Sequence, residues 1–389
     1  MLNGANKTPA TVRVWIAGGG TGGHVYPGLA TVQALAADSL YSTQNGRLEL
    51  LYVGGEGGIE EGLAQRASLP FVGVPGGGIH GLSLRQIIRN IGRLARGTVA
   101  VYRLARNERP SALFVTGGYA SVPVAVGCWM RRVPILLYLP DIEPGWAVRF
   151  IAVLAKRIAV TVEESCKYFP SRKVVVTGYP VRAEFAEVHR ARARKALGLQ
   201  SDSPVLLVLG GSRGARPLNQ ALLNNVNRVL ELAQVVHVSG ELDWPDVAKF
   251  RESLVTEQKS RYHAFPYMHD IGLAMASADL ILCRSGASTL GELPYFGLPA
   301  ILVPYSHAWR YQQVTAGWLA ERGAACMMSE DRLMDDLVHV LERLFSDPGA
   351  LSEMSGQMRA LARPEAASSL ARELIGLAYR QAEGRALAQ

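Results

Sequence analysis

Two glycine-rich segments of the chain each follow a short apolar run and precede a helical pattern. They are Gly18-Gly19-Gly20-Thr21-Gly22-Gly23-His24 and Gly210-Gly211-Ser212-Arg213-Gly214-Ala215. Glycine lets the backbone turn tightly and approach a ligand, and the N-terminus of a helix attracts anionic groups. A third segment of this kind, Thr116-Gly117-Gly118-Tyr119-Ala120-Ser121, also follows an apolar run. Each segment alone is compatible with a structural turn, but the three together predict a site for a phosphate-bearing ligand.

A fourth segment, Cys283-Arg284-Ser285-Gly286-Ala287-Ser288-Thr289-Leu290-Gly291-Glu292, has the same position after an apolar run. Its small residues allow the start of a helix to approach phosphate oxygens, and two hydroxyl groups add hydrogen-bond donors. The carboxylate of Glu292 can accept hydrogen bonds from a ribose diol. The alternative role for Glu292 is that of a surface acid that offsets the helix dipole.

The first glycine segment also matches the spacing GxGxxG of dinucleotide-binding proteins through Gly18, Gly20 and Gly23. That fingerprint requires an acidic residue about 20 residues further along the chain. The candidate acid, Glu56, comes well beyond that distance. An NAD(P)-dependent oxidoreductase is therefore a remote alternative.

Short apolar runs alternate with longer helical patterns along the whole chain. Continuous apolar runs are typical of parallel strands that are covered on both faces. The alternation predicts an α/β protein with two Rossmann-like, doubly wound domains. The runs expected to form the first sheet are Val12–Ile16, Leu48–Val53, Ala112–Val115, Ile135–Tyr138, Ile158–Val162 and Lys173–Val176, and those of the second are Val205–Leu209, Val235–Val238, Tyr262–Phe265, Leu280–Cys283 and Ala300–Val303.

The length and composition of the chain agree with two folded domains. It has 389 residues, of which 49% are hydrophobic and 19% charged, enough apolar material for two cores. The polar segment Arg182–Leu199 separates the two series of strands. We therefore expect an N-terminal domain over residues 10–182 and a C-terminal domain over 183–363. A helical tail over 364–389 could return to the first domain.

The net charge of +8 favours phosphates, nucleic acids or an anionic membrane as partners. Arg85, Arg89, Arg93 and Arg96 recur at helical spacing beside an apolar stripe. This pattern predicts a basic amphipathic helix that binds the surface of an anionic membrane. The alternative is a packed helix with a solvated basic face. No recognised nucleic-acid-binding motif accompanies the charge, so we expect no nucleic acid as partner.

Several further features bear on the location of the protein. The four cysteines contain no CxxC pair, which argues against a zinc site and fits a reducing compartment. Residues 1–10 are polar and lack the apolar core of a signal peptide. Arg131 and Arg132 interrupt the most apolar stretch, so we expect no membrane-spanning helix. We predict a peripheral protein on the cytoplasmic face of the cell membrane.

Five sequence segments are most informative as a set. In chain order they are GGGTGGHVYP, TGGYASVP, GYPVR, GGSRGARPLNQ and CRSGASTLGELPYFGLPAILVPYSHAWRYQQ. Their order and spacing resemble the MurG family of peptidoglycan glycosyltransferases over about residues 12–325. The resemblance implies the GT-B fold, with two Rossmann-like domains that face each other across a cleft. It also implies transfer of N-acetylglucosamine from UDP-N-acetylglucosamine to the membrane-bound acceptor lipid I, which gives lipid II for the cell wall.

The resemblance also implies roles for individual residues of the first domain. Thr21, Gly22 and Gly23 would lie against the donor diphosphate and the acceptor. His24 would lie near the reacting sugar as a candidate general base. Arg182 would reach the phosphates or the nucleoside of the donor.

In the second domain, which would hold most of the donor, the resemblance implies a longer series of contacts. Ser212 would bond the diphosphate, and the backbone of Met268 would read uracil. Ala287, Ser288 and Thr289 would cap the α-phosphate, with Leu290 and Gly291 completing this segment, and Glu292 would hold the ribose. Gln312 and Gln313 would bond the hydroxyls of the transferred sugar, whereas without the resemblance they read as residues of a helix surface.

The sequence departs from the family pattern in two places. Where the family has His-Glu-Gln-Asn before Pro-Gly, this chain has Tyr138-Leu139-Pro140-Asp141-Ile142-Glu143, so Asp141 takes the place of the asparagine. The segment His307-Ala308-Trp309-Arg310-Tyr311 lacks an acidic residue that is common there. Both departures fall near the sugar and the acceptor, so they bear on acceptor identity more than on the nucleotide.

The implied reaction inverts the anomeric centre and needs a base for the acceptor hydroxyl and oriented donors for the departing diphosphate. His24 suits the first task, because an imidazole has a pKa of about 6.5, and Asp141 could assist it or act as the base itself. No DxD-like acidic pair stands beside a phosphate turn, so we expect no essential metal and no cofactor. A glycosyltransferase with a different lipid or small-molecule acceptor, and a non-catalytic UDP-sugar-binding protein, remain alternatives.

Overall fold

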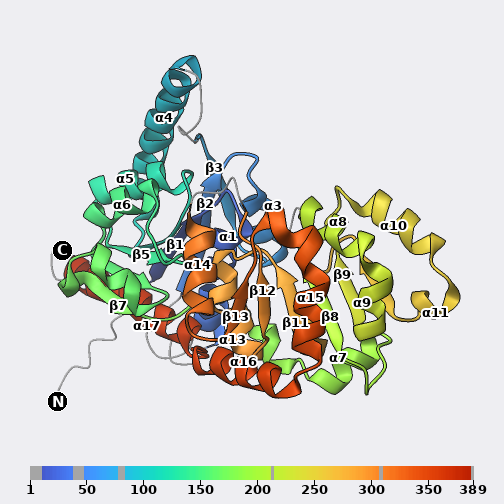
Figure 1. Cartoon of the computed structure of the whole chain (residues 1–389). Coiled ribbons are helices and arrows are strands. Elements are labelled where there is room, and N and C mark those ends of the chain that lie inside the picture. Colours follow the sequence, from blue (N-terminus) through green and yellow to red (C-terminus); the bar gives the residue numbers. More distant parts are fainter. Residues whose placement is uncertain (1–10, 38–47, 78–83, 212–213, 306–309, 387–389) are drawn as a thin grey trace. The chain divides into compact units, whose positions relative to one another are not determined.

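The computed structural model describes residues 11–37, 48–77, 84–211, 214–305 and 310–386 of the chain. These residues form two compact units. The first contains residues up to Ala183 together with the segment from Pro364 onward, and the second contains Glu184–Arg363. Each unit is built around one parallel sheet covered by helices (Figure 1).

The sheet of the first unit has the strand order β3-β2-β1-β4-β5-β6-β7, and all its strands are parallel. The strands are β1 (Val12–Gly18), β2 (Leu48–Gly55), β3 (Phe71–Val74), β4 (Ala112–Gly117), β5 (Ile135–Leu139), β6 (Arg157–Val160) and β7 (Val174–Val176). The helices are α1 (Gly22–Ala37), α3 (Ile59–Arg66), α4 (Leu84–Glu108), α5 (Ser121–Met130), α6 (Trp146–Leu154), η1 (Glu163–Tyr168), η2 (Ser171–Lys173) and α17 (Ala366–Ala386).

The last helix of the chain, α17, belongs to the core of the first unit. Its buried side chains Leu370, Leu374 and Ala378 pack in one cluster with residues of β1, β4 and α1. An ion pair of 3.0 Å between Arg157 of β6 and Glu373 adds a polar contact. The chain therefore leaves the first unit, forms the second and returns to cover the first sheet.

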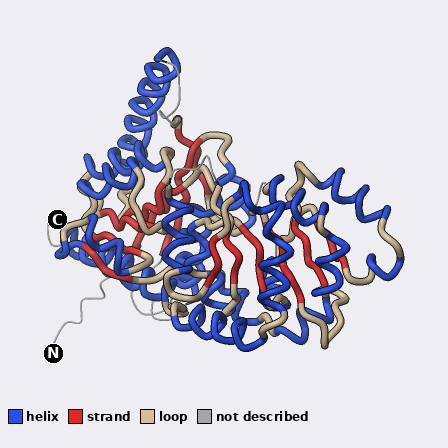
Figure 2. The backbone as a smooth tube through the Cα atoms, in the orientation of Figure 1, coloured by secondary structure: helices blue, strands red, loops and turns tan. Residues whose placement is uncertain are grey.

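The sheet of the second unit has the order β10-β9-β8-β11-β12-β13 and is also parallel throughout. Figure 2 shows the strands in red with the helices in blue around them. The strands of the second sheet are β8 (Val205–Leu209), β9 (Gln234–Val238), β10 (Tyr262–Phe265), β11 (Leu280–Cys283), β12 (Ala300–Leu302) and β13 (Ala325–Met327). The helices are η3 (Ala183–Glu187), α7 (Arg190–Ala196), α8 (Arg216–Asn224), α9 (Val226–Leu232), α10 (Trp244–Ser253), α11 (Thr256–Lys259), α12 (Ile271–Ser277), η4 (Ala287–Leu290), α13 (Glu292–Phe296), α14 (Tyr311–Ala320), η5 (Glu330–Arg332), α15 (Leu333–Phe345) and α16 (Pro348–Ala360).

The predicted α/β class with two doubly wound sheets is confirmed, and every apolar run predicted as a strand overlaps one. Among the strands of the described residues, β3 and β13 were not predicted. The first has a glycine among its four residues and the second has only three residues, so neither forms an apolar run long enough to stand out.

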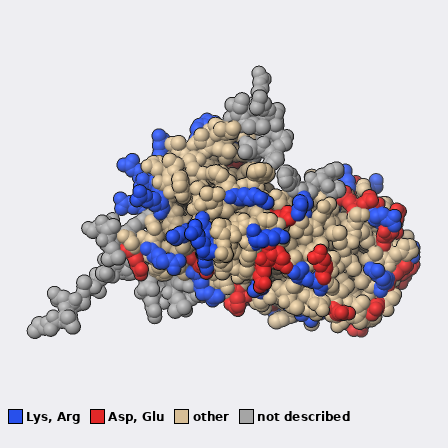
Figure 3. All heavy atoms as spheres, turned by 60° about the vertical axis from the view of Figure 1, so that its left-hand side comes forward, with Lys and Arg blue, Asp and Glu red and all other residues tan. Residues whose placement is uncertain are grey.

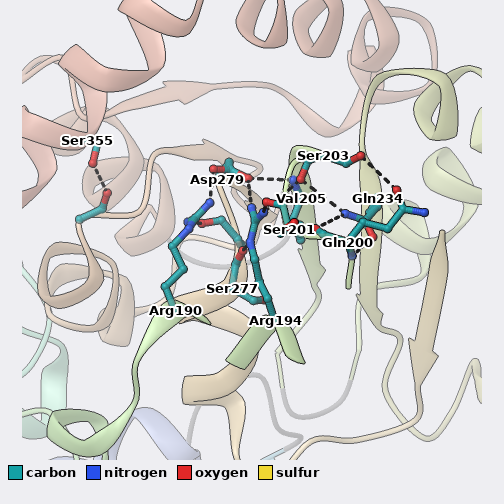
Figure 4. A network of polar contacts seen from close by, with 12 residues as sticks. Arg190, Arg194, Gln200, Ser201, Ser203, Val205, Gln234, Ser277, Asp279 and Ser355 are labelled. Atoms are coloured by element: carbon teal, nitrogen blue, oxygen red, sulfur yellow. Dashed lines mark hydrogen bonds and ion pairs between the residues drawn. The ribbon is translucent and has the colours of Figure 1, made fainter. Parts of the chain in front are cut away.

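A polar network fixes the amino-terminal end of the second sheet (Figure 4). The guanidinium of Arg194, almost fully buried on α7, forms an ion pair of 2.7 Å with Asp279 and donates to the carbonyl of Ser277. The same Asp279 carboxylate accepts from the backbone N–H of Val205 at 2.8 Å. The Arg194–Asp279 ion pair and its hydrogen bonds to the backbone therefore hold α7 against the starts of β8 and β11.

Candidate active site

Each sheet has one point at which the order of the strands reverses direction. This point lies between β1 and β4 in the first unit and between β8 and β11 in the second. In open α/β sheets, ligands bind beyond the carboxyl ends of the strands at such a point. The four segments singled out in the sequence follow these four strands, so the fold brings them in pairs to the two switch points.

His24 and Asp141 come together in the first unit. His24 lies in the first turn of α1, and Asp141 follows directly after β5. The Nδ1 atom of His24 lies 3.1 Å from the hydroxyl of Thr21, and its ring packs against Gly117. A Cβ at Gly117 would stand 2.9 Å from the His24 ring, and the φ of +108° at this position also favours glycine.

Burial and mutual charge set the protonation of this pair. Desolvation lowers the pKa of His24, while the charge of Asp141 and a hydrogen bond to the Gly19 backbone raise it in part. Desolvation raises the pKa of Asp141, and the charge of His24 opposes that rise. The lowered pKa keeps the imidazole neutral at neutral pH, as a general base must be.

A buried carboxylate supports the first glycine turn, and the sequence reasoning missed it. Glu60, in the first turn of α3, is 1% exposed and accepts hydrogen bonds from the backbone N–H groups of Gly55 at 3.0 Å and Gly20 at 3.4 Å. Glu56 follows the end of β2 but is exposed. The only sequence signal for Glu60 was an acidic residue within the glycine-rich stretch GGEGGIEE.

Arg182 also belongs to this end of the first unit. Its guanidinium lies over the ring of Tyr26 in α1, with 5.1 Å between the guanidinium carbon and the ring centroid. Tyr26 in turn lies beside Gly22. The chain therefore places a cation next to the helix start that carries Gly22, Gly23 and His24.

The second glycine turn is tight and lies on a carbonyl group. Gly211 and Gly214 have φ angles of +88° and +80°, and the N–H of Gly214 donates to the carbonyl of Gly211 at 3.0 Å. A Cβ at Gly214 would stand 2.2 Å from the carbonyl oxygen of Ser239, whereas one at Gly211 would meet open space. Ser212 and Arg213 lie outside the described residues.

A buried chain of hydrogen bonds through the neutral side chains of Asn219, His237 and Tyr262 holds that carbonyl in place. The amide of Asn219 donates to the Ser239 carbonyl at 2.9 Å and to Asp243 at 2.8 Å, so its oxygen must accept from Nε2 of His237 at 2.9 Å. The Nδ1 atom of His237 then accepts from the Tyr262 hydroxyl at 2.7 Å. Burial lowers the pKa of His237 to about 3, so the ring is neutral.

The segment after β11 presents its backbone toward the same end of the second sheet. Gly286 precedes the short helix η4, and a Cβ on it would meet open space. The Thr289 hydroxyl donates to the Gly286 carbonyl at 2.6 Å, and the Leu290 side chain is buried. Leu290 can thus reach a ligand only through its backbone.

Glu292 and Gln312 each lie close to the carboxyl end of β11. Glu292 begins α13. Burial raises the pKa of the Cys283 thiol and the charge of Glu292 adds to this rise, which places the carboxylate near the end of β11. The Gln312 side-chain oxygen accepts from the Tyr305 N–H at 2.9 Å, and its carbonyl accepts from Ser285 at 2.7 Å.

For Gln313 and Met268, two further predicted residues of the second unit, the structure shows the element and the burial but no specific contact. Gln313 is exposed in the first turn of α14, and Met268 lies half-buried between β10 and α12. His307, Ala308 and Trp309 lie outside the described residues.

Comparisons with known proteins agree with this arrangement. The glycosyltransferase family 28 N-terminal domain matches residues 14–160, and the family 28 C-terminal domain matches residues 205–370. A protein of Roseiflexus sp. (strain RS-1), named UDP-N-acetylglucosamine–N-acetylmuramyl-(pentapeptide) pyrophosphoryl-undecaprenol N-acetylglucosamine transferase, is 39% identical over 95% of this chain and 96% of its own length. The chain belongs to the MurG family. A similarly named protein of Desulforudis audaxviator (strain MP104C) is 37% identical over 92% of this chain and 96% of its own length.

A solved structure supports the fold of this MurG family member. The crystal structure of Acinetobacter baumannii MurG has a TM-score of 0.70 at 23% sequence identity and covers 94% of this chain and 99% of that one. Family membership overturns the oxidoreductase alternative, and the occupation of the Gly20 amide by Glu60 gives a physical reason. In dinucleotide-binding turns the second glycine lets the backbone approach the pyrophosphate.

Proposed function

We propose that this chain transfers N-acetylglucosamine from UDP-N-acetylglucosamine to lipid I with inversion of the anomeric centre, which forms lipid II. The observation that carries this proposal is the similarity over nearly the full length to relatives named for this reaction. The neutral His24 beside Asp141 at the first switch point supplies the chemistry that such a transfer needs.

In the proposed step, the acceptor hydroxyl of lipid I attacks the anomeric carbon of the donor sugar. A bond forms between this oxygen and that carbon, and the bond from the carbon to the diphosphate oxygen breaks. His24 takes the proton of the hydroxyl, and UDP departs with the bonding electron pair. Asp141 stabilises the imidazolium that results, because its charge already raises the pKa of His24.

The donor contacts of the proposal lie mainly in the second unit. The backbone after Gly286, with Ala287 to Gly291, faces the phosphates, and Glu292 accepts hydrogen bonds from the ribose. The turn with Ser212 adds contacts to the diphosphate, the backbone of Met268 reads uracil, and Gln312 and Gln313 bond the sugar. In the first unit, Thr21, Gly22 and Gly23 lie against the substrates, and Arg182 reaches the phosphates.

In the proposed step, backbone N–H groups and Arg182 stabilise the leaving diphosphate. A helix N-terminus and a guanidinium both stabilise negative charge on phosphate oxygens. We therefore expect turnover without an added divalent metal.

We further propose that the first unit docks on the anionic cytoplasmic face of the membrane. Trp129, Met130 and Val153 are 52%, 52% and 76% exposed and line one cavity of about 1160 Å³ together with Arg132 and Lys156. Figure 3 shows Lys and Arg side chains gathered over the part of the first unit that faces the viewer. Exposed apolar side chains beside cations are the combination that binds an anionic bilayer surface.

Helix α4 contributes to this proposed surface. It projects from the first unit in Figure 1, and Ile91 and Val99 on it are 54% and 49% exposed. Arg89, Arg96 and Arg103 are also exposed, while the side chain of Arg85 lies outside the described residues. Within the described residues, none of the helices combines the length and hydropathy that crossing a bilayer requires.

The experiment that tests the proposed function is UDP release by the purified chain from UDP-N-acetylglucosamine and a short-chain lipid I analogue, with and without EDTA. We expect release that depends on the analogue, persists in EDTA and yields the lipid II analogue. UDP binding without release would exclude lipid I as acceptor. The aspartate at position 141, where the family pattern has asparagine, would then direct the search to other lipid or small-molecule acceptors.

A further inference from the structure

The carboxylate of Glu60 is buried beneath the Gly18–Gly20 turn, which precedes the proposed base His24. This carboxylate is 1% exposed and lies between two turns, one after β1 and one after β2. One oxygen accepts the N–H of Gly55 at 3.0 Å and the other accepts the N–H of Gly20 at 3.4 Å. A single side chain from α3 therefore joins the two turns at the switch-point end of the sheet.

The space around this carboxylate is shaped by glycines. A Cβ at Gly19 would stand 2.3 Å from a carboxylate oxygen, one at Gly58 2.5 Å, and one at Gly54 2.7 Å from the Glu60 side chain. Real Cβ atoms do not approach other atoms so closely. Gly19, Gly54 and Gly58 thus form a cradle around the Glu60 side chain, so the two glycines that belong to GGEGGIEE, Gly54 and Gly58, have a steric reason.

The turn held by Glu60 also holds His24. The ring of His24 forms a hydrogen bond with the backbone of Gly19, the residue that touches the carboxylate from the other side. The Tyr52 hydroxyl donates to the carbonyl of Gly18 at 2.7 Å, and Gly118 packs directly against the carbonyl of Gly19. A shift of the Gly18–Gly20 turn would therefore move the His24 ring.

We propose that Glu60 is a positioning residue for the transfer reaction, an inference that rests on the proposed function. Its carboxylate fixes the Gly18–Gly20 turn, and through this turn the His24 ring. It also occupies the N–H groups of Gly20 and Gly55, to which a phosphate could otherwise bind. The first turn therefore serves the base, and the donor diphosphate is left to the other groups of the site.

The test compares Glu60→Gln with Glu61→Gln, its half-buried neighbour on α3. Glutamine keeps the shape of the side chain but sets an NH₂ group against one of the two backbone N–H donors. Misplacing a catalytic group by a fraction of an ångström to 1 Å can cost a factor of about 10 to 100 in rate. We expect kcat of Glu60→Gln to fall by this factor, with the KM for UDP-N-acetylglucosamine within about threefold of the wild type, and Glu61→Gln to match the wild type.

The single variant Gly19→Ala keeps the proposal testable if Glu60→Gln is unstable, because it should lower kcat by the same factor on its own. In Gly19→Ala the added methyl group pushes against the same carboxylate, so the two changes act through one contact. We expect the double variant to lose no more in kcat than the worse single variant, because changes at one contact are not additive. Multiplied losses in the double variant would overturn the role.

The outcomes separate this inference from the proposed function. A wild-type chain that releases no UDP with the lipid I analogue overturns the proposed function and the role together. Wild-type turnover with an unchanged Glu60→Gln overturns the role alone. A Glu60→Gln variant whose KM rises as much as its kcat falls, with a collapsed thermal unfolding midpoint, has only lost structure, which also overturns the role.

Discussion

The two glycine turns of this chain occupy equivalent positions in two sheets of the same topology, yet their supports differ in charge. Beneath the first turn, the Glu60 carboxylate accepts backbone N–H groups of Gly20 and Gly55. The second turn packs on the Ser239 carbonyl, which the neutral amide of Asn219 holds. Asp243, the acid nearest to that amide, forms an ion pair with Arg216 at 2.7 Å.

The difference shows how one supersecondary unit can be adapted to two tasks. When an internal carboxylate accepts the N–H groups of a turn, the turn can hold a general base in a fixed position but has few donors left to bind a phosphate. A turn supported by neutral groups keeps the attraction of its helix N-terminus for anions. The proposed division of labour, with the base in the first unit and the donor nucleotide mainly in the second, follows from this contrast.

The largest effect is expected from removing the base of the first unit. His24→Ala should lower kcat by a factor of about 10² to 10⁴, the usual range for losing a general base. The KM for UDP-N-acetylglucosamine should change little. His339, whose side chain is 73% exposed in the second unit, offers a matched control as His339→Ala. Near-normal turnover of His24→Ala at saturating acceptor would remove His24 from the mechanism.

A substitution in the proposed donor site of the second unit should change KM and leave kcat nearly unchanged. Glu292→Ala deletes the proposed ribose contact, and a hydrogen bond to a charged group contributes about 1.5–3 kcal/mol, or about 10- to 100-fold in affinity. We expect the KM for UDP-N-acetylglucosamine to rise by this factor while kcat stays within a few-fold. The exposed Glu321 gives the control Glu321→Ala. A loss confined to kcat would contradict the assignment of Glu292 to the donor.

The pH dependence tests the pairing of His24 with Asp141. Since burial lowers the pKa of His24, kcat/KM should fall on acidification with a midpoint below about 6.5. The charge of Asp141 raises that pKa, so Asp141→Asn should move the acid limb to lower pH. We also expect a lower kcat, because the imidazolium loses its stabilising charge. An acid limb that stays in place would show that the two side chains are not coupled.

The smallest effect concerns the neutral support of the second turn. Because the pKa of His237 is about 3 in the folded protein and about 6.5 in the unfolded chain, the unfolded state binds the extra proton between these values. Stability from this group is complete above about pH 6.5 and is lost as the pH falls toward 3. At pH 5 the loss is about 2 kcal/mol.

Urea unfolding at pH 7 and pH 5 measures this loss, with His237→Gln as the variant that cannot take up the proton. The variant should lose less of its free energy of unfolding than the wild type between the two pH values. Equal losses in both proteins would mean that His237 does not govern the acid sensitivity of this support.

The sequence predicted most of the fold because buried parallel strands leave continuous apolar runs. It failed at β3 and β13, whose runs are short, although their neighbours in the sheets fix them as strands. His24 and Asp141 could be named because they match positions of the family motifs, and each also follows a strand whose carboxyl end meets the same edge of the sheet. Their coupling, by contrast, depends on side-chain geometry.

Glu60 and Asn219 could not be predicted from local pattern. The stretch GGEGGIEE offers three acids, and only the packing of α3 decides that Glu60 turns inward while Glu56 is exposed. Asn219 and His237 are 18 positions apart, and their bond requires α8 and β9 to be packed. Glu60 and Asn219 both lie beneath glycine turns that the sequence identified. The turns themselves are determined by local sequence, whereas the charged and polar groups around them are brought there by the packing of distant segments.

The most direct measurement of the central claim is hydrogen–deuterium exchange on adding UDP-N-acetylglucosamine without acceptor. We expect slower exchange in peptides that span residues 205–216 and 283–293, and no change over residues 12–20 and 48–60, where Glu60 already engages the N–H groups of Gly20 and Gly55. Slower exchange over residues 12–20 with none in the second unit would contradict this account, since the first turn would then be the one that binds the donor.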